Sequence, residues 1–400
     1  MNPEVLVTGI GLVTPAGVDR ETTWAAVLAG RSTSARDSEL AGLSVDLACR
    51  VGKLDHPVLQ RDATNLDPVT RFALAATAEA LAHAGLDPAV WDGSRVAVVT
   101  GGSFGGMSVL DAAVSCQLKG DPEDVSPYFL PSYLMNMASA TIAIRFGATG
   151  PSLSAGTACA SGATAVGVAG DLLAAGRCDL AIVCGADAAI TRLVVTGFAQ
   201  LRALSNRASR PFDSARDGFV IAEGAGALVL ECSAHAKARG AEPLARLLGY
   251  GSSTDAHHLV APHPEGRGAE AAIGAALHDA GLTFTDVGHV NAHGSSTQLN
   301  DRVEASLIGR LFPHRPPVTS AKGSLGHTLG AAGAIEAALT VLTLREGAIP
   351  PTAGLDEVDP RIDAGIDVVA RSARRQEVRV AISNSFGMGG HNAVSVFAKV

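Results

Sequence analysis

The sequence predicts an α/β protein in which parallel or mixed sheets are covered by helices. Short β-branched apolar runs alternate with helical stretches along the chain, and this alternation begins again past the middle. The 45 glycines and only 4% aromatic residues indicate that helices pack closely on sheets through small side chains. Because 400 residues exceed the usual size of one core, we expect two packed halves.

The first half is expected to contain four strands of a buried sheet, recognised as apolar, β-branched runs. These runs cover residues 4–12, 95–100, 179–184 and 225–230. The helical period predicts helices over residues 70–84 and 160–175. Gly85 and Gly176 follow these two stretches and are typical of helix ends.

A second series of strands and helices follows. It covers residues 244–250, 268–280, 289–292, 331–344 and 378–383. The polar, alanine-rich segment 233–242 is the expected seam, which divides the chain into an N-terminal half (1–240) and a C-terminal half (241–400). Ligand sites of such folds lie in the crevice at the carboxyl ends of the strands.

Charge and cysteine usage exclude several classes of protein. A net charge of −8 provides no field for a polyanion, so we expect no nucleic-acid partner. Six cysteines without metal-binding spacing indicate reduced thiols, a cytoplasmic location and no metal site, and the N-terminus lacks the features of a signal peptide. Residues 146–170 carry no charge but contain Pro151 and many small polar residues, which favours a buried strand, turn and helix over a membrane span.

Cys159 lies in the stretch GTACASG, at the first turn of the helix predicted over 160–175. Unpaired backbone N–H groups and the helix dipole at that position favour a thiolate and lower the pKa of the thiol. The same amides can hold the oxyanion that forms when the sulfur attacks an acyl carbon. The alternative is that Cys159 only packs, as buried free cysteines commonly do. The choice depends on partner residues elsewhere in the chain.

His293 is the first candidate partner, in the stretch VNAHGSSTQLND. It closes an apolar strand, so its imidazole can face a crevice, while the hydroxyls of Ser295 and Thr297 can bind a polar ligand. A loop histidine without a role is the alternative.

Lys322, His327 and Glu336 surround a glycine-rich turn in SAKGSLGHTLGAAGAIEAAL. A buried lysine needs a counter-charge, and Glu336 is the nearest candidate in the sequence. The last stretch, VAISNSFGMGGHNAV from Val380, contains a glycine-rich loop whose N–H groups suit an anion. Glycine loops serve tight turns as often as ligands.

Four of these stretches, TACASG, VNAHGSST, KGSLGHTLGAAGAIEA and NSFGMGG, together with SRPFDSARDGFVIAEGAGALVLE from Ser209, resemble β-ketoacyl carrier-protein synthases in order and spacing. The resemblance spans nearly the whole chain and is closest to the elongating fatty-acid synthase II type and its type II polyketide relatives. It implies a thiolase-like fold with two similar halves in five α-β-α-β-α layers, and a dimer. It also implies that no cofactor is bound, because substrates arrive on the phosphopantetheine arm of acyl carrier protein.

The resemblance also implies roles for the residues singled out above. Cys159 would take the acyl chain from a thioester, and His293 and His327 would promote decarboxylation of a malonyl thioester by hydrogen bonds to its oxygen. Lys322 would organise the site with Glu336. The other implied roles are an oxyanion hole of the Cys159 and Met388 amides, pantetheine binding by Ser295 and Thr297, an acyl pocket and gate of Phe104, Phe386 and Met388, and a carrier-protein contact at Arg202.

Three residues depart from the family pattern. Met388 replaces the phenylalanine of FGFGG, which suggests a looser gate because methionine is flexible. Ser295 replaces the commoner threonine of HGTST. Phe104 stands where relatives floor the acyl pocket, so it can block long chains, rotate away, or answer a partner subunit. The segment ALSNRASRPFD is shorter than in common fatty-acid relatives, so the nearby carrier-protein surface can differ, and Arg202 just before it can equally be an ordinary surface arginine.

Other functions fit less well. A chain-length factor typically lacks the nucleophilic cysteine, a biosynthetic thiolase fits the paired HGSST and GHTLGAAG pattern less well, and a hydrolase would need a GxSxG turn. Composition and the departures above favour a type II polyketide or polyene-forming synthase over housekeeping fatty-acid elongation. A homodimer and a heterodimer with a chain-length factor both remain open.

Overall fold

The computed structural model describes residues 4–60, 66–362 and 365–400. Its main feature is a sheet of 11 strands in the order β13-β11-β10-β15-β16-β9-β1-β8-β6-β4-β5. The strands of this sheet are β1 (Val5–Val13), β4 (Val96–Gly101), β5 (Ser152–Ala155), β6 (Leu180–Asp187), β8 (Gly224–Cys232), β9 (Ala245–Thr254), β10 (His289–Asn291), β11 (Pro317–Thr319), β13 (Asp367–Val368), β15 (Val380–Gly387) and β16 (His391–Ala398).

Two small sheets and the helices complete the described part. The small sheets consist of β2 (Ala35–Arg36), β3 (Leu47–Cys49) and β7 (Ile221–Ala222), and of β12 (Ala348–Ile349) and β14 (Arg374–Arg375). The α-helices are α1 (Arg20–Leu28), α2 (Pro68–His83), α3 (Met107–Lys119), α4 (Phe129–Tyr133), α5 (Met137–Phe146), α6 (Ser161–Ala174), α7 (Arg192–Gln200), α8 (Ser233–Ala238), α9 (Arg267–Asp279), α10 (Gln298–Leu311), α11 (Lys322–Leu325) and α12 (Ala332–Glu346).

The large sheet repeats one strand order on either side of its centre. One side runs β1-β8-β6-β4-β5 and the other β9-β16-β15-β10-β11. On both sides the first two pairings are antiparallel and the next two are parallel. Strands β1 and β9 join the sides through a short antiparallel pairing. The expected second strand and helix series is therefore present, and we keep a boundary between residues 240 and 241, which separates α8 from β9, as a proposal.

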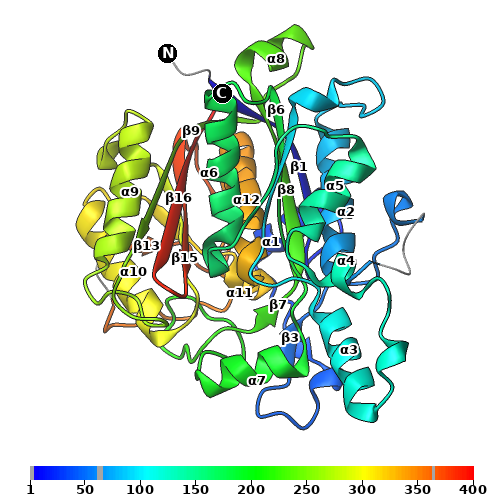
Figure 1. Ribbon diagram of the computed structural model, residues 1–400. Helices are drawn as coiled ribbons and strands as arrows, with labels where there is room; N and C mark the ends of the chain where they lie inside the picture. Colours follow the sequence, from blue (N-terminus) through cyan, green and yellow to red (C-terminus); the bar gives the residue numbers. More distant parts are fainter. Residues whose placement is uncertain (1–3, 61–65, 363–364) are drawn as a thin grey trace.

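Five layers follow from the positions of the helices (Figure 1). Helices α2 and α5 cover one outer face, and α9 and α10 cover the opposite outer face. Helices α6 and α12 lie in the middle, where α12 packs on both β8 and β15 and α6 packs on both β4 and β9. The expected α/β, thiolase-like, α-β-α-β-α arrangement is confirmed.

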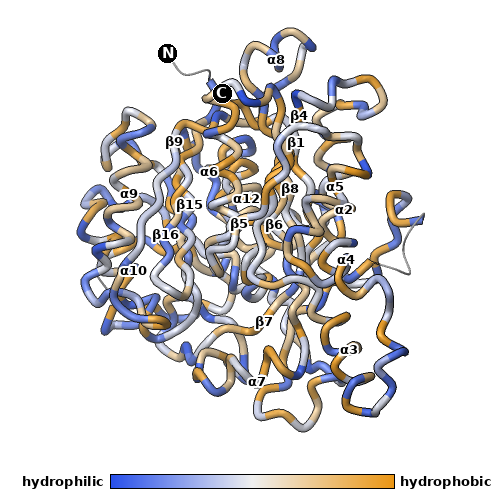
Figure 2. Tube along the Cα trace, viewed as in Figure 1, coloured by the Kyte–Doolittle hydropathy of each residue, from blue (hydrophilic) through white to orange (hydrophobic). Residues whose placement is uncertain are grey.

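The middle helices are apolar because sheet strands lie on both sides of them. Every residue of α12 up to Leu344 is buried, so the helix has no solvent-facing stripe. Figure 2 shows the hydrophobic residues concentrated along these helices and the strands. The two helices also approach closely: a Cβ atom on Gly162 of α6 would lie 2.5 Å from the backbone nitrogen of Ala334 on α12. Small residues are thus required where the middle helices meet.

Local sequence features explain the ends of α2. The Asp67 carboxylate accepts the N–H of Val69 at 3.1 Å, and Pro68 occupies the first helical position. The helix ends before Gly85. The φ of this residue is 65°, a left-handed conformation that glycine adopts without strain because it has no Cβ atom. Gly176, with φ 66°, follows α6 in the same way. Both predicted helix ends are confirmed.

One expectation about residues 146–170 is wrong. The turn and helix α6 are present, but strand β5 is not buried. It forms the edge of the large sheet, next to β4 only, and the side chain of Leu153 is 44% exposed. Among the strands that the structure describes, none pairs with its free edge. Among the described helices, none combines the length and apolar character needed to cross a membrane.

Candidate active site

Cys159 lies in a sharp turn directly before α6. The turn is a 3-10 helix over Ala158–Ala160, and Ala158 takes the left-handed conformation with φ 50°. The end of β15 crosses this turn, because a Cβ atom on Gly387 would lie 3.2 Å from the backbone nitrogen of Cys159. We call Thr157–Ser161 the first elbow. It is held by Ser161, whose hydroxyl donates to the Ala158 carbonyl at 2.6 Å and accepts the Thr157 N–H at 2.9 Å.

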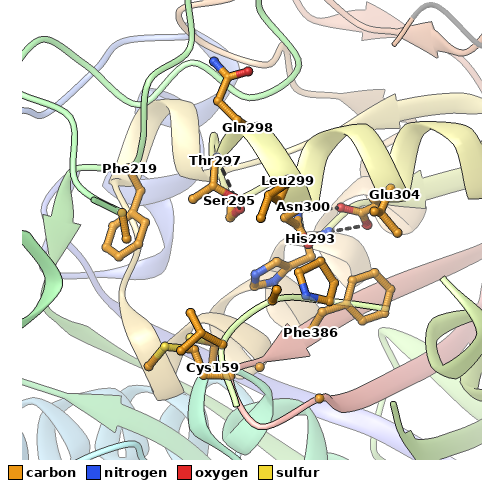
Figure 3. Close-up of a pocket in the computed structure, with 18 of the residues that line it drawn as sticks. Cys159, Phe219, His293, Ser295, Thr297, Gln298, Leu299, Asn300, Glu304 and Phe386 are labelled. Atoms are coloured by element: carbon orange, nitrogen blue, oxygen red, sulfur yellow. Dashed lines mark hydrogen bonds between the residues drawn. The ribbon is translucent and has the colours of Figure 1, made fainter. Parts of the chain in front are cut away.

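A cavity of about 350 Å³ opens at this turn. Its lining comes from both halves of the fold and includes most residues named from the sequence: Cys159, Arg202, His293, Ser295, Thr297, His327, Phe386 and Met388. Figure 3 shows Cys159, His293 and Phe386 around one end of the cavity, with Ser295, Thr297 and Gln298 farther along. Phe104 is outside this lining. It borders a separate cavity of about 10 Å³ with Leu134 and Met135.

Two backbone N–H groups, those of Met388 and Cys159 itself, point at the Cys159 sulfur and stabilise its anion. Burial opposes them and is the larger effect: it raises the pKa of the Cys159 thiol to about 11, although the positive charge of Lys322 also lowers it. The expected lowering of this pKa by the helix end is therefore wrong for the resting site, since the amides do not offset the loss of water around the sulfur.

The main chain of His293 is fixed by two buried charged side chains. Its N–H and that of Gly294 donate to the carboxylate of Glu304 at 2.8 and 2.7 Å. Its carbonyl accepts from Nζ of Lys322 at 2.6 Å. Lys322 also forms an ion pair with Glu336, as expected, and both side chains are buried beneath the cavity. The pair can thus support His293 without touching a substrate.

The tautomer of His327 follows from its neighbour. Nδ1 of this imidazole accepts the N–H of Leu329 at 3.2 Å, so the ring proton is on Nε2. The ring packs edge-on against Phe219, and its centroid is 5.4 Å from that of His293, with the planes 78° apart. No described residue hydrogen-bonds Nδ1 of the buried His293 ring.

Both imidazoles are neutral at physiological pH. Burial lowers the pKa of His293 well below 6.5, and the charge of Lys322 lowers it further. Burial and then Lys322 do the same for His327. A neutral imidazole keeps an N–H that can donate to a developing oxyanion, without the desolvation cost of a buried cation.

The chain matches the family models of the β-ketoacyl synthase N-terminal domain over residues 2–236 and of the C-terminal domain over residues 244–356. It belongs to the β-ketoacyl synthase family. This synthase is similar to the 3-oxoacyl-[acyl-carrier-protein] synthase 2 of Vibrio harveyi, with 38% identity over 99% of this chain and 98% of the relative. It is an acyltransferase that forms carbon–carbon bonds.

Two solved structures resemble this synthase over their whole length. The ishigamide ketosynthase/chain length factor superposes with a TM-score of 0.92 at 32% identity and covers 100% of both chains. The ketosynthase in a complex described as AntDE:AntF, a type II polyketide carrier protein with its ketosynthase bound to a hexaketide, gives a TM-score of 0.90 at 30% identity, also over 100% of both chains.

The entrance of the cavity carries the predicted polar groups. The hydroxyls of Ser295 and Thr297 are 2.9 Å apart, so they present one paired hydrogen-bonding surface. Arg202 is exposed there and forms no ion pair within the described ranges. Nowhere in residues 4–60, 66–362 and 365–400 are three or more His, Cys, Asp or Glu side chains arranged to hold a metal ion.

Sequence reasoning missed two buried acidic residues of this synthase, Glu304 and Asp187. Glu304 holds the His293 main chain and also accepts from Asn384 at 3.2 Å. Asp187, at the end of β6, accepts three backbone N–H groups. An acid in the otherwise apolar stretch CGADAAI was the available signal for Asp187, and Glu304 could have been found by its place on the helix after the HGSST loop.

Proposed function

We propose that this synthase condenses an acyl group carried on Cys159 with a malonyl unit, both delivered by acyl carrier protein, in a polyketide or polyene pathway. The observation that carries the proposal is the placement of a cysteine and two neutral imidazoles around one cavity, with two amides aimed at the sulfur. No cofactor is needed in this scheme, because the phosphopantetheine arm belongs to the substrate.

The first step transfers the acyl group. The Cys159 sulfur attacks the thioester carbonyl, a new carbon–sulfur bond forms, and the pantetheine thiol leaves with the proton that Cys159 gives up. The amides of Cys159 and Met388, which point at the sulfur, would hold the oxyanion of this step. Ser295 and Thr297 would hold the pantetheine arm at the cavity entrance.

The second step forms the carbon–carbon bond. The malonyl thioester loses carbon dioxide, and the electron pair of the broken bond becomes an enolate whose oxygen accepts hydrogen bonds from His293 and His327. The enolate carbon attacks the acyl carbonyl on Cys159, and the sulfur leaves and regains a proton from solvent. Lys322 and Glu336 support His293 from below and take no proton in this scheme.

The first experiment asks whether Cys159 carries the acyl group. Incubation with an acyl carrier protein loaded with hexanoate should add one hexanoyl mass to the intact chain, and Cys159→Ala should abolish the adduct. Cys232→Ala is the matched control because its half-buried thiol lies at the end of β8, away from the cavity. An adduct that persists in Cys159→Ala would refute the assignment.

Phe104 would limit the length of the acyl chain that the enzyme accepts. The cavity beside it holds only about 10 Å³, so its ring leaves little room for a long saturated chain. We expect Phe104→Ala to admit longer acyl primers in a competition between hexanoyl and dodecanoyl carrier proteins. An unchanged primer preference would remove the floor assignment.

Fatty-acid elongation is the second candidate, because the similar Vibrio harveyi protein is named 3-oxoacyl-[acyl-carrier-protein] synthase 2, and elongation of a saturated chain needs the same condensation. Competition between saturated and 2-enoyl primers of equal length separates the two. A polyene-forming synthase should favour the unsaturated primer, whereas an elongating synthase should favour the saturated one. The six free thiols suit a reducing cytoplasm, where we place the reaction.

We also propose a two-subunit enzyme that pairs through the exposed edge of β5. Unpaired strand edges with apolar side chains are templates for another chain. The exposed apolar residues of this face are Leu118, Leu130, Leu134, Ile144 and Leu153. The partner is a second copy or a chain-length factor. Arg202 would meet an acidic carrier protein at the cavity entrance.

A further inference from the structure

Asp187 is a fully buried acid that neither the motifs nor the proposed chemistry uses. It forms no ion pair with any residue in the described ranges. Its carboxylate accepts backbone N–H groups instead: Oδ2 from Ser103 at 2.9 Å and Gly330 at 2.6 Å, and Oδ1 from Phe104 at 3.1 Å. Burial raises the pKa of Asp187 to about 7, and these hydrogen bonds only partly offset the loss of water, so the cost of burying the acid asks for a function of the bonds.

The three donors connect two parts of the site. Ser103 and Phe104 belong to the loop between β4 and α3, which borders the small cavity. Gly330 belongs to the turn before α12, directly after Leu329, whose N–H fixes the tautomer of His327. Asp187 is therefore the bridge between the proposed acyl-pocket floor and the turn that orients an imidazole.

The repeated fold shows why the bridge is a carboxylate. The turn before α12 copies the first elbow: Leu329 has φ 52° where Ala158 has φ 50°, and Gly330 stands in the place of Cys159. At the first elbow, Gly387 at the end of β15 lies against the Cys159 amide. At the turn before α12, Asp187 at the equivalent end of β6 lies against the Gly330 amide. An elbow amide therefore donates to a carboxyl group of the protein itself, where it would otherwise serve a substrate.

We propose that Asp187 is a positioning residue that fixes the Phe104 loop to the start of α12, so that acyl-chain length and the orientation of His327 are set together. This inference rests on the proposed function. Asp187 touches no substrate and acts through Phe104 and Gly330. Its negative charge also raises the pKa of Cys159, which places it within electrostatic reach of the nucleophile.

Asp187→Asn distinguishes the Phe104 bond from the Ser103 and Gly330 bonds, and it keeps the volume of the side chain. The amide oxygen can keep the two donors at the Oδ2 position, but the NH₂ group then faces the N–H of Phe104 and cannot accept it. The Phe104 loop should loosen while the Gly330 turn stays held. Asp187→Ala removes all three acceptors and should affect both ends of the bridge.

The test compares primer selectivity and malonyl decarboxylation in purified variants. For Asp187→Asn we expect the kcat/KM ratio of dodecanoyl to hexanoyl primers to rise roughly tenfold, as for the loss of one buried hydrogen bond. For Asp187→Ala we expect, in addition, a fall of kcat for malonyl decarboxylation with an unchanged KM. Glu231→Gln is the control, since Glu231 is an equally buried acid held by Arg239 and His235, away from the cavity.

A double-mutant cycle with Phe104→Ala completes the test. If Asp187 acts through Phe104, the two substitutions should change primer selectivity by less than the product of their separate effects. Unchanged selectivity and an unchanged kcat in Asp187→Asn and Asp187→Ala, in protein that still condenses, would overturn the inference. Absence of condensation in the unsubstituted enzyme would instead refute the proposed function.

Discussion

The sulfur of Cys159 is protonated in the resting site, and this sets the order of events. Burial raises its pKa to about 11, so the thiolate forms only as the acyl group arrives and the amides of Cys159 and Met388 gain a full anion to hold. The neutral imidazoles beside it complement this arrangement, because they can donate hydrogen bonds without attracting the thiol proton first.

Alkylation of Cys159 should follow its raised pKa. We expect the rate with iodoacetamide to increase roughly tenfold per pH unit between pH 7 and pH 9, because the reactive thiolate is a minor species throughout. Intact mass over time measures the rate, and Cys159→Ala gives the background of the other thiols. An alkylation rate that stops rising near pH 7 would show that the helix end does lower the pKa of the Cys159 thiol.

The two imidazoles should matter most for decarboxylation. His293→Ala or His327→Ala removes one donor to the enolate oxygen and should slow carbon dioxide release by about 100-fold or more. Some acyl transfer to Cys159 should remain, because the amides that serve that step are intact. Release of labelled carbon dioxide and the acyl adduct mass measure the two steps. Full carbon dioxide release in both variants would contradict the assignment.

The pH dependence of decarboxylation follows from the same two rings. Their pKa values are lowered well below 6.5, so both stay neutral as the pH falls from 8 through 6.5 and the rate should not change. In the unfolded chain these histidines bind protons near pH 6.5, so folding stability should fall as the pH drops below that value. Thermal unfolding and carbon dioxide release across this range check both parts.

At the scale of elements, the close contact of α6 and α12 places the catalytic residues. Both helices begin at an elbow beside the cavity, one at Cys159 and the other after His327. Gly162 and Gly333 allow the contact, since a Cβ atom on Gly333 would lie 2.4 Å from the backbone nitrogen of Ala163. The distance between the Cys159 sulfur and the two imidazoles thus depends on the small size of these two glycines.

Gly162→Ala should therefore impair both stability and condensation. The added methyl group forces the two helices apart, which costs about 1–3 kcal/mol. Gly274→Ala on α9 is the control, because nothing lies within 4 Å of its Cβ position and the substitution should be neutral or stabilising. Denaturant unfolding and the condensation rate measure the effect. Equal behaviour of the two variants would contradict this account of the helix contact.

The sequence predicted the elements well and their surroundings less well. Runs such as residues 179–184 and 331–344 were recognisable because apolar periodicity is local. The exposure of β5 was not, since a strand of Ser, Leu and Ala is compatible with either an edge or the centre of a sheet. The raised pKa of Cys159 and the bridge at Asp187 depend on burial by residues more than 80 positions away, which no local pattern records.

At the scale of the molecule, we propose that the exposed edge of β5 forms the interface between two subunits. Leu153→Lys puts a charge on this edge and should convert a two-subunit enzyme into single chains of 40.4 kDa. Val400→Lys, at the far end of the chain, should leave the assembly unchanged. Size-exclusion chromatography with light scattering measures both. A mass that stays constant in Leu153→Lys would refute pairing through β5, and a dimer seen only on co-expression would identify a chain-length factor as the partner.

Arg246 contacts both ends of the described chain. Its guanidinium lies 3.7 Å from the Glu4 carboxylate and donates to the Lys399 carbonyl at 3.3 Å. A short glycine-serine linker can therefore join Glu4 to Lys399, and new ends can be opened between residues 240 and 241. Such a circular permutant keeps every strand of the large sheet in place while reversing the order in which its two sides are synthesised.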